Sequence, residues 1–519
     1  MMWTELPLLE IVVAAPLLTA VAIMATPEKM HRAVRSLAAL GAGVTLLGSV
    51  AVLLAYDYDT GGVQMASSYP LVPDLGISLE LGVDGWGVSL LLLTGLIIFA
   101  GVFATWTLVK RVREFYAMLL VLVTGVLGVF VSLDLFVFFL FYEIAVLPMY
   151  LLIGIWGSSH KVADAGPLRF VWRLLDIGGK EYAAMKLTLM LLIGSALIIA
   201  AMFGMYFEAG ATSFDLRHLE SHTYSMGLQM WAFPALWIGF GTLAGLWPFH
   251  TWSPDGHAAA PTAVSMLHAG VLMKLGAFGV IRIGMMLLPE GAREWVWVVG
   301  TVAALNIVYG ALAAMAQRDM KYIVAYSSVS HMGVVLLGAA AMTVNGWNGA
   351  IYQMVAHGLM TGLFFALVGL IYERANKTRD IDQFGGFAHK MPFVAAFFTL
   401  ACLSSLGMPG LAGFIAEWLV FLGAWQGATA WWAIAGLIGA WITAIYVLRA
   451  TKIIFWGGPP DERWTKLSDP TGSEWIPLWI LGIALVVFGC APALVLDAID
   501  VATSEYLPRV TGVALEVLR

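Results

Sequence analysis

Runs of roughly 20 apolar residues, about the length that a helix needs to cross a bilayer core, recur along this whole chain. Of its 519 residues, 61% are hydrophobic and 12% are charged. A membrane β-barrel would instead need short segments of alternating polarity, and the apolar runs here are continuous. We therefore expect an all-α polytopic protein in the lipid bilayer. The net charge of −6 argues against a nucleic-acid partner.

The apolar runs predict about fourteen transmembrane helices. The predicted spans are 8–26, 34–56, 85–107, 116–133, 135–156, 186–207, 228–252, 262–286, 295–316, 321–342, 348–371, 392–422, 428–449 and 475–498. Residues 57–84, between the second and third spans, hold many turn formers and no Lys or Arg, which predicts a small hairpin.

Lysine and arginine are distributed unevenly between the two sides that this helix count defines. Twenty of the 27 lie in alternate loops on one side, and four lie in loops on the other. Loops rich in Lys and Arg stay in the cytoplasm. We therefore expect both termini to be non-cytoplasmic, with the chain in the inner (plasma) membrane of a prokaryote.

Two spans are interrupted. The seventh contains "GLWPFHTWSPDGHAAAPT", in which Pro248, Pro254 and Pro261 break the helix, and the twelfth is broken at Pro409 among several glycines. Broken helices at corresponding places mark transporters built from inverted repeats. We expect two inverted five-helix repeats, spans 4–8 and 9–13, and a polar half-channel at the first break. The predicted regions are 1–115, 116–286, 295–449 (spans 9–13) and 450–519, the C-terminal loop and last span.

Ionisable side chains inside spans are costly to insert, so each is a functional candidate. The alternatives are a structural ion pair for the acids and lysines, a satisfied core group for each histidine, and snorkelling to the surface for Lys186. Asp134 and Arg282 lie near span ends, where we expect them at the interface. The candidate residues for proton translocation are Glu143, Lys186, His250, His268, Lys274, His331, His357 and Glu417.

Several of these residues lie in motifs that resemble a known family. The motifs are "FYEIAVLPMYLLIGIWG", "WPFHTWSPDGHAAAPT", "GVLMKLGAFG", "RDMKYIVAYSSVSHMG", "QMVAHGLMTGLFF" and "MPGLAGFIAEW". In order and spacing, over about residues 80–455, they resemble the antiporter-like membrane subunits of respiratory complex I, most closely the M-subunit (chain 4) branch. Subunits of multi-subunit cation/proton antiporters and membrane-bound hydrogenases share the pattern less closely.

The resemblance implies a proton-translocating membrane-arm subunit of an NADH (or related donor):quinone oxidoreductase. Its partners would be the other membrane subunits, and protons would move along a mid-membrane line from Glu143 through Lys274, His331 and His357 to Glu417. The chain has two cysteines, Cys402 and Cys490, both in apolar runs, too few for an iron–sulfur cluster. We expect no cofactor in this chain, and NAD, FMN, iron–sulfur clusters and quinone in partner subunits. An antiporter or hydrogenase subunit and a non-pumping scaffold are the alternatives.

The chain departs from the family pattern in three places. A lysine usually lies five residues before the proline of "PFHTW", and Leu243 stands there, so Glu143 lacks its expected partner. His268 is more typical of the large L subunit. The cytoplasmic loop 157–185 is longer than usual, and "PLRFVWRLLDIGG" within it predicts a helix in the membrane interface or a solvated linker.

Overall fold

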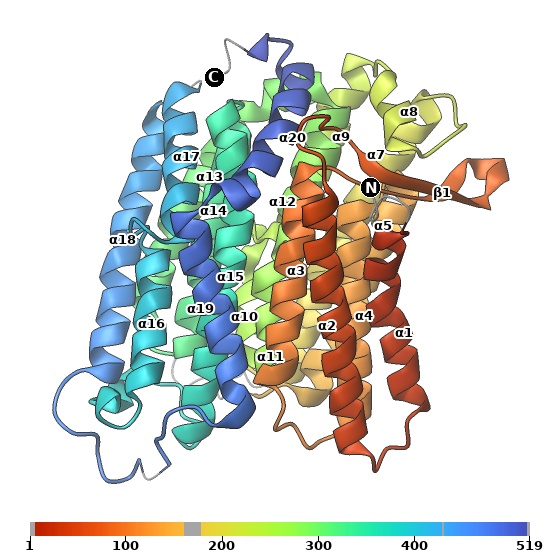
Figure 1. Ribbon diagram of the computed structural model, residues 1–519. Helices are drawn as coiled ribbons and strands as arrows, with labels where there is room; N and C mark the ends of the chain where they lie inside the picture. The colour runs from red at the N-terminus through yellow and green to blue at the C-terminus, as the bar shows by residue number, and fades with distance from the viewer. Residues whose placement is uncertain (1–5, 160–177, 428–429, 465, 516–519) are drawn as a thin grey trace.

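The structure is a computed structural model that describes residues 6–159, 178–427, 430–464 and 466–515. Long helices pack side by side into one bundle (Figure 1). Within the described residues, thirteen helical stretches are long and apolar enough to cross a membrane. The shorter helices Pro392–Ser405 and Ala412–Gln426 occupy the predicted twelfth span. The all-α polytopic fold is confirmed, and the helices correspond to the fourteen predicted spans.

Helices make up most of the described residues, and two strands lie between the second and third long helices. The N-terminal region contains α1 (Leu8–Ala25), α2 (His31–Ala55), β1 (Gln64–Val72), β2 (Ile77–Val83) and α3 (Gly85–Ala104). The next contains α4 (Val112–Val131), α5 (Leu135–Trp156), α7 (Lys180–Glu208), α8 (Leu216–Ser221), α9 (Met226–Ala244), α10 (Trp252–Ala259), α11 (Thr262–Leu267) and α12 (Met273–Gly279). Then come α13 (Pro289–Ala316), α14 (Met320–Ala340), α15 (Val344–Arg374), α16 (Pro392–Ser405), α17 (Ala412–Gln426) and α18 (Ala430–Phe455). The chain continues with α19 (Trp475–Cys490) and α20 (Ala493–Thr511).

Both predicted helix breaks are present. Helix α9 ends at Gly245, whose φ of +82° is the left-handed conformation that favours glycine, and α10 begins seven residues later at Trp252. In the twelfth span, Gly407 and Gly410 take φ values of +70° and +90° between α16 and α17. Each break frees backbone groups in the interior of the bundle, where protein or water has to bind them.

The eighth span is less regular than a continuous apolar run predicts. It consists of α11, a π-helical turn at His268–Leu272, α12 and a second π-helical turn at Val280–Met285. Every residue from Ala263 to Met285 is buried. Such turns are rare and are frequently found at functional sites, and the first one here begins at a candidate histidine.

Two short antiparallel bridges relate the two predicted repeats. Asp134 caps the start of α5 and pairs with Asp215, while Asp319 caps the start of α14 and pairs with Asp380. The flanking backbone bonds repeat the same pattern, Leu216 N to Leu133 O in one and Ile381 N to Arg318 O in the other. Because successive long helices alternate in direction, the bridges lie at opposite ends of the bundle. This correspondence supports the expected inverted repeats, which stay a prediction.

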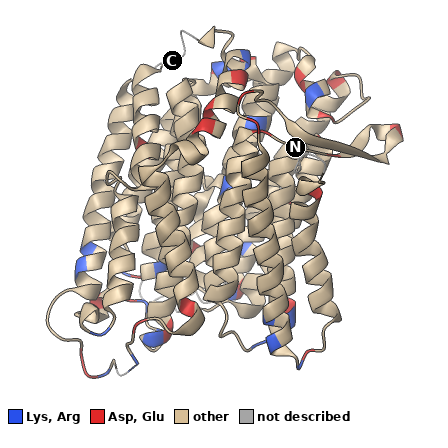
Figure 2. Cartoon of the chain, in the orientation of Figure 1, with Lys and Arg blue, Asp and Glu red and all other residues tan. Residues whose placement is uncertain are grey.

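The two ends of the bundle differ in their loops. Lys and Arg gather in the loops of the lower end in Figure 2, and further arginines lie at the upper end. Helix α1 begins and α20 ends toward the upper end (Figure 1). The predicted hairpin at 57–84 is confirmed as antiparallel β1 and β2, also at the upper end.

The C-terminal region differs from the prediction of a single span at 475–498. Helix α19 ends at Cys490, and a second helix, α20, begins at Ala493, just after Pro492. Proline lacks an N–H, so it cannot continue a helix but suits the start of the next one. The thiol of Cys490 is exposed rather than buried, whereas Cys402 is buried. The predicted interfacial segment at residues 167–179 falls mainly outside the described residues.

Candidate functional site: a line of titratable side chains

Lys274 is the centre of the site. It lies on α12, directly after the first π-helical turn, and it is fully buried. Its ammonium group donates to the carbonyl of Ala269, and its Nζ lies 2.7 Å from Nδ1 of His357 on α15. The structure therefore brings two predicted candidates, one from each predicted repeat, into direct contact.

His357, His331 and Glu417 continue from Lys274. The rings of His357 and His331 are stacked with their centroids 5.3 Å apart. Nε2 of His331, on α14, lies 3.6 Å from Oε1 of Glu417 at the start of α17. The Nδ1 of His331 lies 2.8 Å from the carbonyl oxygen of Ser327, so both ring nitrogens face oxygen acceptors. Lys274, His357, His331 and Glu417 thus form a continuous line of proton-binding groups, each in contact with the next.

Glu143 lies apart from this line. The carboxylate, on α5, is half-buried and accepts a 2.5 Å hydrogen bond from Oγ of Ser195 on α7. Leu243 is fully buried and apolar. Among the residues that the structure describes, no ion pair to Glu143 is found, as the loss of the expected lysine predicts.

Lys186, for which snorkelling to the surface was the alternative, forms an ion pair with a carboxylate on another helix. Helix α7 begins at Lys180, so Lys186 lies nearly two turns inside it. Its Nζ forms a 2.7 Å ion pair with Asp255 on α10, and the hydroxyl of Tyr322 on α14 donates to the other oxygen of Asp255 at 2.8 Å. This cluster ties α10, the helix after the first break, to α7 and α14.

The other two candidate histidines lie near the first break. His250 is buried in the turn that precedes α10, and its ring meets the ring of Tyr309 edge-on at 5.0 Å. His268 is fully buried, and its ring stacks on His257 at 3.9 Å. Sequence reasoning missed His257, although the motif "HTWSPDGH" contains it two turns after His250.

Two cations that sequence reasoning also missed bind the carboxyl end of α10. Arg379 donates to the carbonyl of Ala258 and Lys321 to that of Ala260, each at 2.7 Å. The carboxyl end of a helix carries partial negative charge and attracts cations. The predicted helix end at the first break could therefore have indicated that basic side chains bind there. Lys321 also lines a cavity of about 610 Å³ that borders the linker between α10 and α11. Lys110, Lys377 and Glu474 are among its other charged lining residues, so the cavity is polar.

Asp134 and Arg282 lie near the ends of their spans, as predicted, and the structure adds that both are buried inside the protein. Arg282 is 5% exposed and forms a 3.1 Å ion pair with Asp84, because the second π-helical turn directs it into the bundle. Asp134 is 1% exposed and accepts backbone hydrogen bonds from Ser78 and Val137. Burial raises the pKa of Asp134 to about 6, against the opposing effect of these bonds. Both residues hold loops and helices at the upper end.

The chain is similar to known membrane subunits over nearly its whole length. Residues 132–443 match the family model described as "NADH:quinone oxidoreductase/Mrp antiporter, TM". The chain is 35% identical to NAD(P)H-quinone oxidoreductase chain 4 1 of Nostoc sp., over 96% of this chain and 91% of the relative. It is 37% identical to the protein of that name from Synechococcus sp. strain JA-3-3Ab, over 96% and 92%.

Solved structures have the same fold. A chain of respiratory complex I from Thermus thermophilus with bound NADH is 30% identical, with a TM-score of 0.84 over 96% of this chain and 99% of that one. A chain of the Mrp complex from Dietzia sp. is 20% identical, with a TM-score of 0.83 over 96% and 97%. This second likeness concerns the fold alone.

Proposed function

Because the chain belongs to the family of NADH:quinone oxidoreductase and Mrp antiporter membrane subunits, we propose that it translocates protons within an NADH (or related donor):quinone oxidoreductase. The observation that carries the proposal is the continuous line from Lys274 through His357 and His331 to Glu417. Buried groups in contact titrate as a coupled set. A proton that moves onto one of them therefore changes the proton affinity of the next.

The rest of the reaction belongs to partner subunits. Two separate free cysteines and no dinucleotide fingerprint leave this chain without redox machinery of its own. NAD, FMN, iron–sulfur clusters and quinone are accordingly assigned to the partners, which include the other membrane subunits of the assembly. Those partners drive the cycle, and this chain supplies the proton path.

Access to the line differs between the two ends of the bundle. The polar cavity beside Lys321 opens at the lower, basic end and supports proton entry there, next to the first helix break. By the distribution of Lys and Arg, that end faces the cytoplasm, and both termini face away from it. Reporter fusions after Arg113 and after Asn345 are expected to report opposite sides. The same side for both would contradict this orientation.

The decisive experiment is purification of the complex that contains this chain in mild detergent. We expect flavin and iron–sulfur subunits to copurify, and the complex in liposomes to take up protons when it reduces quinone. Copurification with hydrophilic antiporter subunits alone, and sodium-dependent proton exchange without electron transfer, would favour the antiporter alternative. If substitutions in this chain leave proton uptake by the complex unchanged, the chain has a scaffold role.

A further inference from the structure

Two buried imidazoles lie in ring contact beside the first helix break. His257, in the last turn of α10, and His268, at the start of the π-helical turn, have ring centroids 3.9 Å apart and an interplanar angle of 28°. Trp252 stacks on His268 at 5.1 Å, and Phe365 stacks on His257 at 5.3 Å. Both histidines are 0% exposed. Residues from α10, α15 and the eighth span thus hold the pair in place.

The ring nitrogens of this pair have no protein partner. Among the described residues, neither nitrogen of His257 nor of His268 has a hydrogen-bond partner. Buried polar groups are almost always hydrogen-bonded, and a neutral imidazole offers one donor and one acceptor. The aromatic contacts cover the ring faces and leave the nitrogens at the ring edges. A site with this chemistry suits water and a mobile proton.

The pair lies between the polar cavity and Lys274. On the cavity side, the hydroxyl of Ser265 donates to the carbonyl of His257 and also contacts that of Ala260. Ala260 in turn accepts from Lys321, which lines the cavity. On the other side, His268 directly precedes Ala269, whose carbonyl accepts from the ammonium group of Lys274. Hydrogen bonds to backbone carbonyls therefore connect the pair to the lining of the cavity on one side and to Lys274 on the other.

Charge limits what the pair can hold. Two imidazolium rings at 3.9 Å would place two positive charges in contact inside the bundle, which is strongly unfavourable at low dielectric. Lys274 from α12 and Lys321 from α14 act electrostatically on the pair, and His257 in turn acts on His357 from α15. All of them are basic, so the pair takes at most one extra proton, and its proton affinity depends on the charge of Lys274.

We propose that His257 and His268 act as one proton-loading site that receives a proton from the cavity and passes it to Lys274. This inference rests on the proposed proton translocation. In loading, an N–H bond forms on one ring as an O–H bond of hydrated proton breaks. In transfer, that N–H bond breaks and one forms on Nζ of Lys274, after Lys274 has given its own proton to His357. The electron transfer in partner subunits drives the cycle.

The test uses the whole complex in liposomes and the variants His257→Phe, His268→Phe and the double variant. Phenylalanine keeps the stacked ring and removes the nitrogens. We expect each single variant to lose most proton uptake per quinone reduced, and the double variant to be no worse than the worse single. Infrared difference spectra on a pH jump are expected to lose the same histidine protonation band in both singles. His389→Phe, an exposed histidine in the basic-end loops, is the control.

Different outcomes separate this inference from the proposed function. Full proton uptake in an assembled double variant overturns the loading site, and so does a histidine band that persists in both singles. Lys274→Met in the same preparation tests the function itself. If Lys274→Met pumps normally, the proposed function falls; if it fails while the double variant pumps, only the loading site falls. If the double variant does not assemble, proton uptake and the infrared band are measured in the two single variants and in His268→Asn, which keeps a polar group. Full uptake in these variants overturns the loading site.

A parallel Lys186→Met variant tests whether Lys186, rather than the histidine pair, passes protons to Lys274. The ion pair of Lys186 with Asp255 lies about a quarter exposed, outside the stacked rings. We expect this variant to retain more proton uptake than either histidine variant. A larger loss in Lys186→Met than in both histidine variants would move the loading site to the Lys186–Asp255 cluster and overturn the proposal.

Discussion

The acids of the two halves lie in opposite surroundings. Glu417, in the second half, is 7% exposed and contacts His331, through which it is linked to Lys274. Glu143, in the first half, is half-buried and bonds the neutral hydroxyl of Ser195, while the neighbouring helix α9 offers apolar Leu243. Two halves of similar architecture therefore differ in whether their acid belongs to the line. The difference predicts that Glu417 contributes more to proton transfer than Glu143 does.

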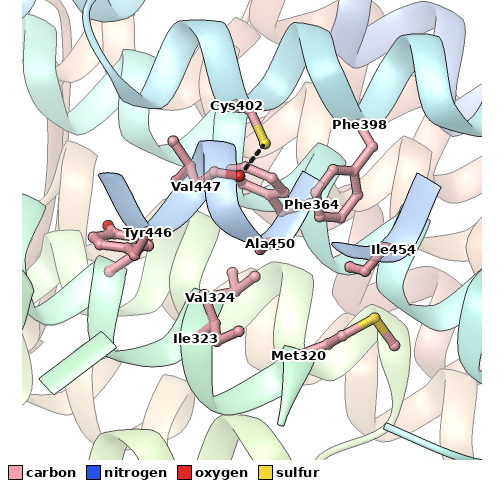
Figure 3. A pocket seen from close by; sticks show the side chains of 11 residues that line it. Met320, Ile323, Val324, Phe364, Phe398, Cys402, Tyr446, Val447, Ala450 and Ile454 are labelled. Atoms are coloured by element: carbon pink, nitrogen blue, oxygen red, sulfur yellow. Dashed lines mark hydrogen bonds between the residues drawn. The ribbon is translucent and has the colours of Figure 1, made fainter. Parts of the chain in front are cut away.

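The spaces at the basic end differ in the same way. Beside the α10–α11 linker the cavity measures about 610 Å³ and has charged walls. A second cavity, between α14, α16 and α18, measures about 20 Å³, and Figure 3 shows mainly apolar side chains around it, among them Phe398, Val447 and Ile454. It adjoins Ser327, one turn before His331. The two cavities thus differ in size and in the charge of the side chains that line them.

The largest expected effect comes from breaking the line itself. Glu417→Gln and Lys274→Met each remove a proton-binding group that nothing replaces, so proton uptake should fall by about 100-fold or more, the range in which a positioned acid or base contributes. Assembly and quinone reduction with an uncoupler should persist. Glu290→Gln, an exposed acid at the upper end, is the control. Normal uptake in both variants would make these residues purely structural.

The next effect concerns the missing lysine. Leu243→Lys places an ammonium group at a site that is 0% exposed and packed against α12. We expect a loss of several kcal/mol of stability, as for an unpaired buried charge, and no gain in proton uptake. Thermal unfolding of the complex and the uptake assay measure both. A stable variant with higher proton uptake would mean that Glu143 takes part in proton transfer once a cation lies beside it. The contrast between the two acids would then depend on the single residue at position 243.

A smaller effect is expected at Glu143. Because its carboxylate is bonded to Ser195 and not to the line, Glu143→Gln should lower proton uptake by less than about tenfold, below the usual contribution of an acid or base. Glu417→Gln, assayed in the same vesicles, is the matched comparison. Equal losses in the two variants would contradict the asymmetry and would bring Glu143 into the route.

The smallest effect concerns the capping aspartates of α5 and α14. The pKa of Asp134 is raised by burial to about 6, from its ordinary 3.8, so the folded state binds the extra proton between these values and stability declines as pH rises through that window. Asp134→Asn should flatten this decline in the unfolding temperature. Asp319 pairs with Arg379 at 2.8 Å, so Asp319→Asn should instead lower stability by removing this ion pair. If the stability of the native chain does not decline in this window, the pKa of Asp134 is not raised in the folded state.

Much of this protein could be predicted without its structure. The continuous apolar runs determine a helical membrane protein, because a bilayer core leaves an isolated backbone few other ways to satisfy its hydrogen bonds. The prolines and glycines determine both breaks, since these effects are local to the chain. The costly ionisable residues identify the candidates one at a time, and the motif order gives the family.

Only the tertiary structure decided which candidates touch. Lys274 and His357 are 83 positions apart, and neither hydropathy nor helical spacing says which faces of α12 and α15 meet. The same holds for the Lys186–Asp255 pair, for the buried position of Arg282 and for the contact of His257 with His268. Proton transfer depends on contacts of a few ångströms between side chains from different helices. Those distances follow from packing, which the one-dimensional pattern of polar and apolar residues does not contain.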